Sequence, residues 1–161
     1  MASYDPVFKV NPPLRSASEV EGVRDGLRDG TVDAIATDHA PHAQEDKERP
    51  FDHAPPGMLG LETALAVVLT ELDLPMAQVL ALFSWQPARI AGLEATHGGP
   101  VAEGRPANLC VIDPAAVWLV EPHRSASRSR NTPFAGRKLT GRVRHTVLWG
   151  VPVVVDGEAQ R

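Results

Sequence analysis

The sequence changes its pattern near residue 96, and this change limits the folds that the chain can form. Residues 1–95 combine helical apolar spacing with one strand-like run, whereas residues 96–161 hold short β-type runs separated by Gly, Pro and Asn. The β-type runs cover residues 108–112, 117–120, 143–148 and 151–155. We therefore predict an α/β part over residues 1–95 and a β-rich subdomain over residues 96–161.

Within the first part, several segments have the spacing of amphipathic helices. The first begins at Ser16, where Glu19 completes a capping box, and ends at Gly30, which suits a left-handed C-terminal cap. Further helices are predicted over residues 61–72 and from Pro75 onward, followed by a short turn from residue 87 to 92. Residues 32–37 lie between these helices and are predicted to form a short strand.

Composition and charge exclude several classes of protein. Of the 161 residues, 43% are hydrophobic and 22% are charged, as expected of a soluble globular protein, and the net charge is −4. Basic residues gather in the segment 121–145 with few aromatic neighbours, a pattern more typical of a solvated face than of a nucleic-acid site. We find neither a signal peptide nor an apolar run of the roughly 18–20 residues that span a bilayer. We expect a cytoplasmic protein with no nucleic-acid or membrane partner.

The single cysteine, Cys110, cannot form an internal disulfide. It lies in an apolar run with Leu109, Val111 and Ile112, and we predict a buried structural thiol there.

The stretch AIATDHAPH, residues 34–42, holds the densest group of chemically active side chains. Asp38 follows the predicted strand directly, and the imidazoles of His39 and His42 come next. In parallel α/β folds the loop that leaves the C-terminal end of a strand faces the active site, where a carboxylate can bind a metal ion or move a proton. The same residue types also occur in solvated turns, so spacing alone leaves both interpretations open.

The segment from residue 39 to 60 is a long polar connection without obvious secondary structure, and loops of that kind are usually functional or disordered. It contains His53 and the run Pro55-Pro56-Gly57, in which glycine lets main-chain groups approach a ligand closely. This second polar cluster favours the active-site interpretation of the preceding motif.

Several motifs along the chain match one family together. The runs FKVNPPLR, ATDHAPH, APPGMLGLETAL and QPARIAGL, with RSRNTPFAGRKLTGRVRHTVLWG near the end, resemble the C-terminal part of a dihydroorotase. The resemblance is to the longer bacterial class within the amidohydrolase superfamily, and it covers the chain from about Tyr4 onward. It implies the last strands and helices of a metal-dependent (β/α)8 barrel over residues 1–95, followed by a small β-rich domain over residues 96–161.

The resemblance also implies an activity and a set of site residues. Dihydroorotases interconvert N-carbamoyl-L-aspartate and L-dihydroorotate in pyrimidine (UMP) biosynthesis with one or two zinc ions. By position, Asp38 matches the metal-ligating carboxylate that acts as general acid and base, and Asn11 and His42 match substrate contacts. Pro56 and Gly57 fall in the substrate loop, although the family often has Phe-Gly there. His39 receives no role.

Other parts of the family pattern do not occur in this sequence. No His-x-His pair is present, and His97, His123 and His145 lie in the β-rich part, where surface or packing roles are expected. A complete barrel needs roughly 250 residues. We therefore expect an incomplete barrel, with the remaining zinc ligands absent from this chain, no turnover by the isolated chain, and weak zinc binding.

Two alternatives to a dihydroorotase fragment remain. The first is a noncatalytic dihydroorotase-like subunit that supports aspartate transcarbamoylase. The second is another cyclic-amide hydrolase, of the hydantoinase or allantoinase type. The resemblance also allows a homo-oligomer or an assembly with aspartate transcarbamoylase as partners.

Overall fold

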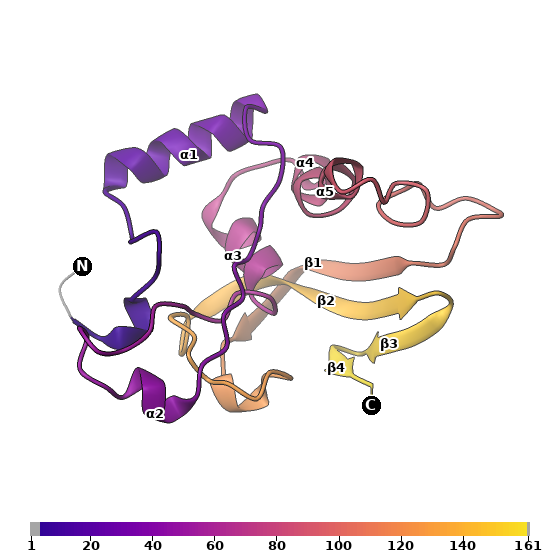
Figure 1. The fold of residues 1–161 in the computed structure, drawn as a ribbon. Coiled ribbons are helices and arrows are strands. Elements are labelled where there is room, and N and C mark those ends of the chain that lie inside the picture. The colour runs from indigo at the N-terminus through magenta and orange to yellow at the C-terminus, as the bar shows by residue number, and fades with distance from the viewer. Residues whose placement is uncertain (1–3, 161) are drawn as a thin grey trace. The chain divides into compact units, whose positions relative to one another are not determined.

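The computed structural model describes residues 4–160, and Figure 1 shows the order of its elements. The helical elements are η1 (Pro6–Phe8), α1 (Ala17–Asp29), α2 (Gln44–Lys47), α3 (Ala64–Glu71), α4 (Met76–Leu80), the π-helical turn η2 (Ala81–Trp85), α5 (Gln86–Ile90) and η3 (Pro122–Arg124). The strands are β1 (Leu109–Leu119), β2 (Lys138–Leu148), β3 (Val151–Val155) and β4 (Glu158–Ala159). In the described residues, no helix is long and apolar enough to cross a membrane.

The chain forms two compact units, each built from separate segments of sequence. The first unit comprises the residues up to Gly22 together with Thr37–Ala64 and Leu119–Lys138, and the second comprises Val23–Ala36, Leu65–Trp118 and the residues from Leu139 onward. These units combine separate segments, whereas the sequence prediction divides the chain once, near residue 96, into a partial barrel and a β-rich part. That boundary stays a prediction.

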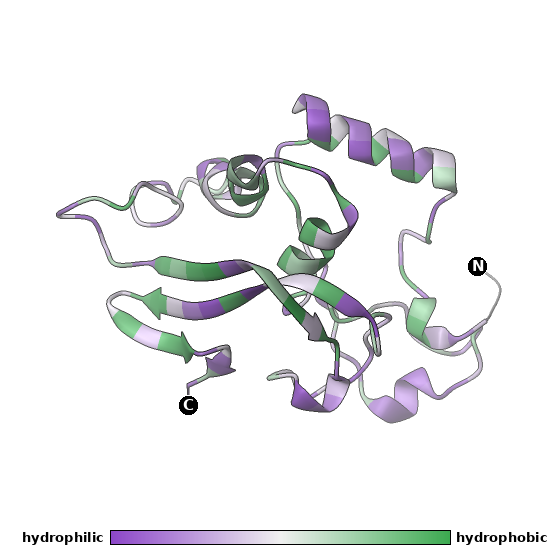
Figure 2. Ribbon diagram, turned by 180° about the vertical axis from the view of Figure 1, so that it is seen from behind, coloured by the Kyte–Doolittle hydropathy of each residue, from purple (hydrophilic) through white to green (hydrophobic). Residues whose placement is uncertain are grey.

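The predicted first helix is confirmed with its caps. The Glu19 carboxylate accepts hydrogen bonds from the Ser16 amide at 3.0 Å and the Ser16 hydroxyl at 2.6 Å, and these bonds lower the pKa of Glu19. Gly30 ends α1 with a φ of +82°, a conformation that suits glycine. In Figure 2 the α1 ribbon alternates between hydrophilic and more hydrophobic residues.

A four-stranded sheet in the order β1-β2-β3-β4 confirms the β-type runs of the second half (Figure 1). β2 pairs antiparallel with β3, and β3 pairs antiparallel with β4. The β2–β3 connection is the two-residue turn Trp149-Gly150, and both residues have positive φ, of 52° and 81°, as a twisted hairpin requires.

Three expectations about local structure are wrong. The runs 108–112 and 117–120 form one strand, β1, because the Asp113 carboxylate accepts from the amides of Ala115 and Ala116 and bridges the position of Pro114. Residues 32–37 form no strand, because their main chain has no neighbouring strand to pair with among the described residues. The segment 39–60 contains the short helix α2.

Cys110 is exposed rather than buried, because it lies on β1 at the edge of the sheet, where Leu109 and Val111 are exposed as well. Neighbouring atoms still remove part of the thiol from water, and this desolvation raises its pKa, although a hydrogen bond with Thr146 opposes the effect.

Close packing of α3 on β2 organises the second unit. A Cβ atom at Gly141, whose φ is +93°, would collide with Cδ1 of Leu69. The Thr140 amide donates to the Thr70 hydroxyl at 2.8 Å, and the Trp118 indole donates to the Gly141 carbonyl at 2.9 Å. Leu139, which directly precedes Thr140, is fully buried. Glycine at position 141 is therefore required both by the backbone and by the contact.

We predict that Gly141→Ala destabilises the protein by roughly 2–4 kcal/mol, because it adds overpacking to an unfavourable left-handed backbone. Gly104→Ala is the matched control, since Gly104 has a φ of +81° but no atom within 4 Å of the place that a Cβ atom would take; it should cost about 1 kcal/mol. Urea denaturation measures both, and equal losses would contradict the packing argument.

Candidate functional site

Asp38 lies where the predicted site begins, and its backbone is unusual. It is exposed, and its φ of 42° places it in the left-handed region that few residues other than glycine adopt. Asp tolerates this region better than most side chains, at a cost of order 1 kcal/mol. The turn directs the chain from residues 32–37 into the segment that carries His39 and His42.

A parallel bridge between His39 and Met58 joins this turn to the Pro-Gly loop, residues 55–57. The Ala40 amide donates to the Met58 carbonyl at 3.0 Å. Gly60 approaches so closely that a Cβ atom there would lie 2.6 Å from the Thr37 carbonyl oxygen. Residues 37–42 of the AIATDHAPH motif and the Pro-Gly loop, separate in sequence, are therefore adjacent in the first unit.

His39, which received no role from sequence, holds this junction together. Its Nδ1 accepts hydrogen bonds from the amides of Gly60, at 3.3 Å, and Leu61, at 3.1 Å. Because both partners can only donate, Nδ1 carries no proton in this arrangement, and the ring proton lies on Nε2. The interaction fixes the start of the turn that leads into α3.

His42 packs against the Pro-Gly loop in a defined orientation. Its Nε2 lies 3.0 Å from the Pro56 carbonyl oxygen, which can only accept, so Nε2 is the donor. In the neutral ring this leaves Nδ1 as a lone-pair acceptor, and the described residues give Nδ1 no hydrogen-bond partner. His42 and Pro56, both predicted as substrate contacts, are thus brought together.

Gly57 is buried at the centre of the cluster. Its amide donates to the Lys9 carbonyl at 2.8 Å, which ties the loop to the segment that carries Asn11, and its φ is +135°. A Cβ atom would lie 2.7 Å from Nε2 of His42 and 2.8 Å from Cβ of Ala40. Only glycine fits this position. Asn11 itself is exposed, two residues beyond Lys9.

Two lysines bind the main chain of the same loop and the residues before it. Lys47 donates to the carbonyls of Pro55 and Gly57, both at 3.0 Å, and Lys9 donates to the carbonyls of Phe51 and Asp52 at 2.7 and 3.1 Å. Burial lowers the pKa of Lys47, and the nearby charge of Lys9 lowers it further, whereas Asp5 raises it.

Asn131 is a further residue of this cluster that sequence reasoning did not identify. It is 7% exposed, its Oδ1 accepts from the His42 amide at 3.2 Å, and its Nδ2 donates to the carbonyls of Ala40 at 2.9 Å and Gly57 at 3.3 Å. The available signal was the run RSRNTPF, because a polar amide among turn residues often bonds to main chain.

A zinc ion does not fit the described residues alone. Protein zinc sites are usually tetrahedral with three or four protein ligands, and no group of three or more His, Cys, Asp or Glu side chains is close enough to hold a metal within residues 4–160. His97 instead packs its ring against Trp149 at 5.7 Å, and His145 lies beside Asp156. Asp38 is the one predicted ligand that the chain presents.

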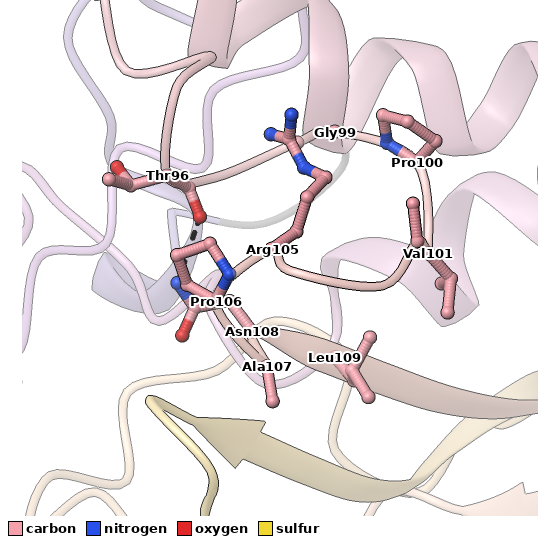
Figure 3. A pocket seen from close by; sticks show the side chains of 11 residues that line it. Thr96, Gly99, Pro100, Val101, Arg105, Pro106, Ala107, Asn108 and Leu109 are labelled. Carbon is pink, nitrogen blue, oxygen red and sulfur yellow. Dashed lines mark hydrogen bonds between the residues drawn. The ribbon is translucent and has the colours of Figure 1, made fainter.

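A pocket of about 100 Å³ lies in the second unit, in the loop between residues 96 and 109 (Figure 3). The side-chain amide of Asn108 donates through Nδ2 to the Thr96 carbonyl at 2.9 Å. The Arg105 guanidinium donates to the Glu94 carbonyl at 2.7 Å and lies against Gly99. None of the predicted site residues lines this pocket, and its polar groups hold the loop itself.

The fold and the cluster define a class of protein. The model of the amidohydrolase family matches residues 10–153, and the chain belongs to this family. The chain is 52% identical over 160 residues to a dihydroorotase of Streptomyces coelicolor, an alignment that covers 97% of this chain and 37% of that protein. It is 46% identical over 162 residues to a dihydroorotase of Mycobacterium tuberculosis, an alignment that covers 98% of this chain and 37% of that protein. The chain thus spans little more than a third of the length of these relatives.

Solved structures give the same partial amidohydrolase fold. An L-hydantoinase (dihydropyrimidinase) from Arthrobacter aurescens superimposes with a TM-score of 0.88 at 29% identity, covering 98% of this chain and 36% of that one. A D-hydantoinase (dihydropyrimidinase) from Thermus sp. superimposes with a TM-score of 0.86 at 24% identity, covering 96% and 35%. At that lower identity the similarity concerns the fold alone.

We predict that Gly57→Ala displaces the His42 ring and destabilises the protein by about 2–4 kcal/mol, because the added Cβ has no room. NMR of the His42 ring and urea denaturation report the two effects. Gly30→Ala is the control, since its φ is +82° in open space; it should leave the His42 resonances unchanged. An unmoved His42 ring in Gly57→Ala would contradict the prediction.

We also predict that the Lys47 amine titrates at a lower pH in the folded chain than in the urea-unfolded chain, because burial and the charge of Lys9 lower its pKa. The folded-state pKa then lies below the unfolded-state value. The charged amine therefore costs stability below its folded pKa, and that cost disappears as the pH rises through the ordinary lysine pKa. NMR titration of the Lys47 side-chain amine with and without urea measures the two midpoints, and a folded midpoint at or above the unfolded one would contradict the prediction.

Proposed function

We propose that this chain provides one wall of a dihydroorotase-type active site, which interconverts N-carbamoyl-L-aspartate and L-dihydroorotate. The observation that carries the proposal is the joining of the AIATDHAPH and Pro-Gly segments around Gly57, in a chain that resembles dihydroorotases along nearly its whole length. The segments joined there carry an exposed carboxylate, an exposed amide and an imidazole whose Nδ1 is not bonded within the described residues.

Each of these groups suits a step of cyclic-amide hydrolysis. Ring opening needs a base for the attacking water and an acid for the departing nitrogen, and the Asp38 carboxylate can take the first proton and return it to the second. Asn11 and Nδ1 of His42 can hold the substrate through hydrogen bonds. Zinc dependence belongs to the same proposal, with Asp38 as one ligand, although the described residues contain no group of three or more His, Cys, Asp or Glu side chains that could hold the ion.

The proposal includes a (β/α)8 barrel of which residues 1–95 are a part. Residues 32–37 have the apolar sequence of a barrel strand, yet no strand pairs with them among the described residues. Neighbouring strands from further sequence or a second chain would supply the missing partners and the remaining zinc ligands. A homo-oligomer, or an assembly with aspartate transcarbamoylase, would be two ways to supply such a chain.

Complementation tests the proposal. The purified chain is mixed with the portion of the Streptomyces coelicolor dihydroorotase that it does not cover, and ring opening of L-dihydroorotate is followed with added zinc. We expect no turnover by the chain alone and turnover by the mixture. Asp38→Asn should then reduce the rate about 100-fold or more, the size of a lost general acid and base.

Asp73→Asn is the matched control for that experiment, because Asp73 is an exposed loop carboxylate and its substitution changes the charge equally. It should leave the rate unchanged. Hydrolysis of hydantoin in preference to dihydroorotate would favour the hydantoinase-type alternative, which the structural similarity to the Arthrobacter enzyme supports. A correctly folded mixture without turnover on either substrate would favour the noncatalytic alternative.

A further inference from the structure

We propose that Asn131 is the positioning residue of the candidate site, which holds the His42 imidazole so that Nε2 faces Pro56 and Nδ1 faces a ligand. The proposal rests on the proposed function, because it assigns His42 to ligand binding. Asn131 comes from the segment 119–138, far in sequence from both loops that it joins.

The side-chain amide of Asn131 uses its oxygen and both of its N–H donors on these two loops. Oδ1 accepts from the His42 amide, and Nδ2 donates to the Ala40 carbonyl and to the Gly57 carbonyl. The residue is 7% exposed and its bond to Gly57 is buried, so losing that bond would leave the Gly57 carbonyl without this partner in a buried place. One side chain therefore fixes the main chain on both sides of the His42–Pro56 contact.

Asn131 is itself held in place independently of that side chain. Its main-chain carbonyl accepts from the Leu59 amide at 3.0 Å, and the neighbouring Thr132 amide donates to the Arg130 carbonyl at 2.8 Å. The Glu62 carboxylate accepts from the amides of Ala126 and Ser127, both at 3.0 Å, which anchors the start of the same segment. These contacts give the amide a fixed base from which to orient the loops.

The chemistry requires an amide at position 131. A carboxylate of the same shape could still accept from the His42 amide, but it could not donate to the two carbonyls and would repel their oxygens. With the Gly57 carbonyl released on that side, the loop could shift and Pro56 would no longer fix Nε2 as the donor. Asn131→Asp should therefore let the His42 ring populate both tautomers and rotate.

The test uses the 161-residue chain with Asn131→Asp and, as a matched control, Thr132→Val. Thr132 is also buried, at 6% exposure, but its hydroxyl accepts from the Phe134 amide of its own turn at 3.3 Å rather than from either loop of the site. ¹⁵N NMR of the imidazole reports the His42 tautomer, and titration with L-dihydroorotate reports affinity. The Leu59 amide, bonded to the main chain of residue 131, reports by hydrogen exchange whether the segment stays in place.

We expect the unmodified chain to hold its proton on Nε2 of His42. In Asn131→Asp we expect a mixed tautomer, retained protection of the Leu59 amide, and about tenfold weaker binding, the size of one to two lost hydrogen bonds. Thr132→Val should match the unmodified chain in tautomer and in affinity. A proton on Nδ1 in the unmodified chain would overturn the proposal, even if Asn131→Asp does not fold.

Two further results would overturn it in different ways. An unchanged His42 tautomer in Asn131→Asp would show that the amide does not position the ring. A changed tautomer with unchanged affinity would show that the ring orientation does not serve binding. If the unmodified chain binds no dihydroorotate, the proposed function fails for the isolated chain, while the tautomer measurements still decide whether Asn131 positions His42.

Discussion

The main-chain hydrogen bonds of residues 57–59 are the constraint on which the first unit depends. Each of these three consecutive residues bonds to a different part of the chain: the first to the carbonyl of residue 9, the second to the amide of residue 40, and the third to the carbonyl of residue 131. Because polar main-chain groups in a buried segment must be paired, the three partner segments cannot move independently. The candidate site residues inherit their positions from this junction.

The junction also explains why small and polar residues occupy its centre. Gly57 is needed because three segments meet there with no space for a Cβ atom, and a buried amide at position 131 satisfies both loops at once. Lys47 adds charge-assisted bonds to two carbonyls of the loop at the cost of partial desolvation. An apolar core could not replace these contacts, because it would leave the carbonyls unpaired.

Sequence patterns predicted the features that depend on local chemistry. The capping box at Ser16 and the glycine cap of α1 were correct because caps are made within a few residues. The β-type runs predicted the sheet, but they did not predict that two of the runs form the single strand β1. The Asp113 side chain bonds to main chain between those runs, and apolar periodicity carries no information about such a bond. The roles of His39 and Asn131 were missed because their partners lie far away in sequence, about 20 residues from His39 and about 90 residues from Asn131. The catalytic and substrate roles of the five predicted residues stay predictions.

The hydrogen bonds already made in the junction limit how a ligand could use it. The Gly57 amide has a single proton and gives it to Lys9, so that amide cannot donate to a substrate without breaking the junction. The Pro56 carbonyl keeps a second lone pair beyond the one that His42 uses, so the loop is equipped to accept from a ligand N–H. A cyclic amide carries such N–H groups, whereas its carboxylate needs donors. Among the predicted contacts, the side chain of Asn11 can donate to that carboxylate, whereas Nδ1 of the neutral His42 ring can only accept. Asn11 lies two residues beyond Lys9, whose carbonyl the Gly57 amide holds.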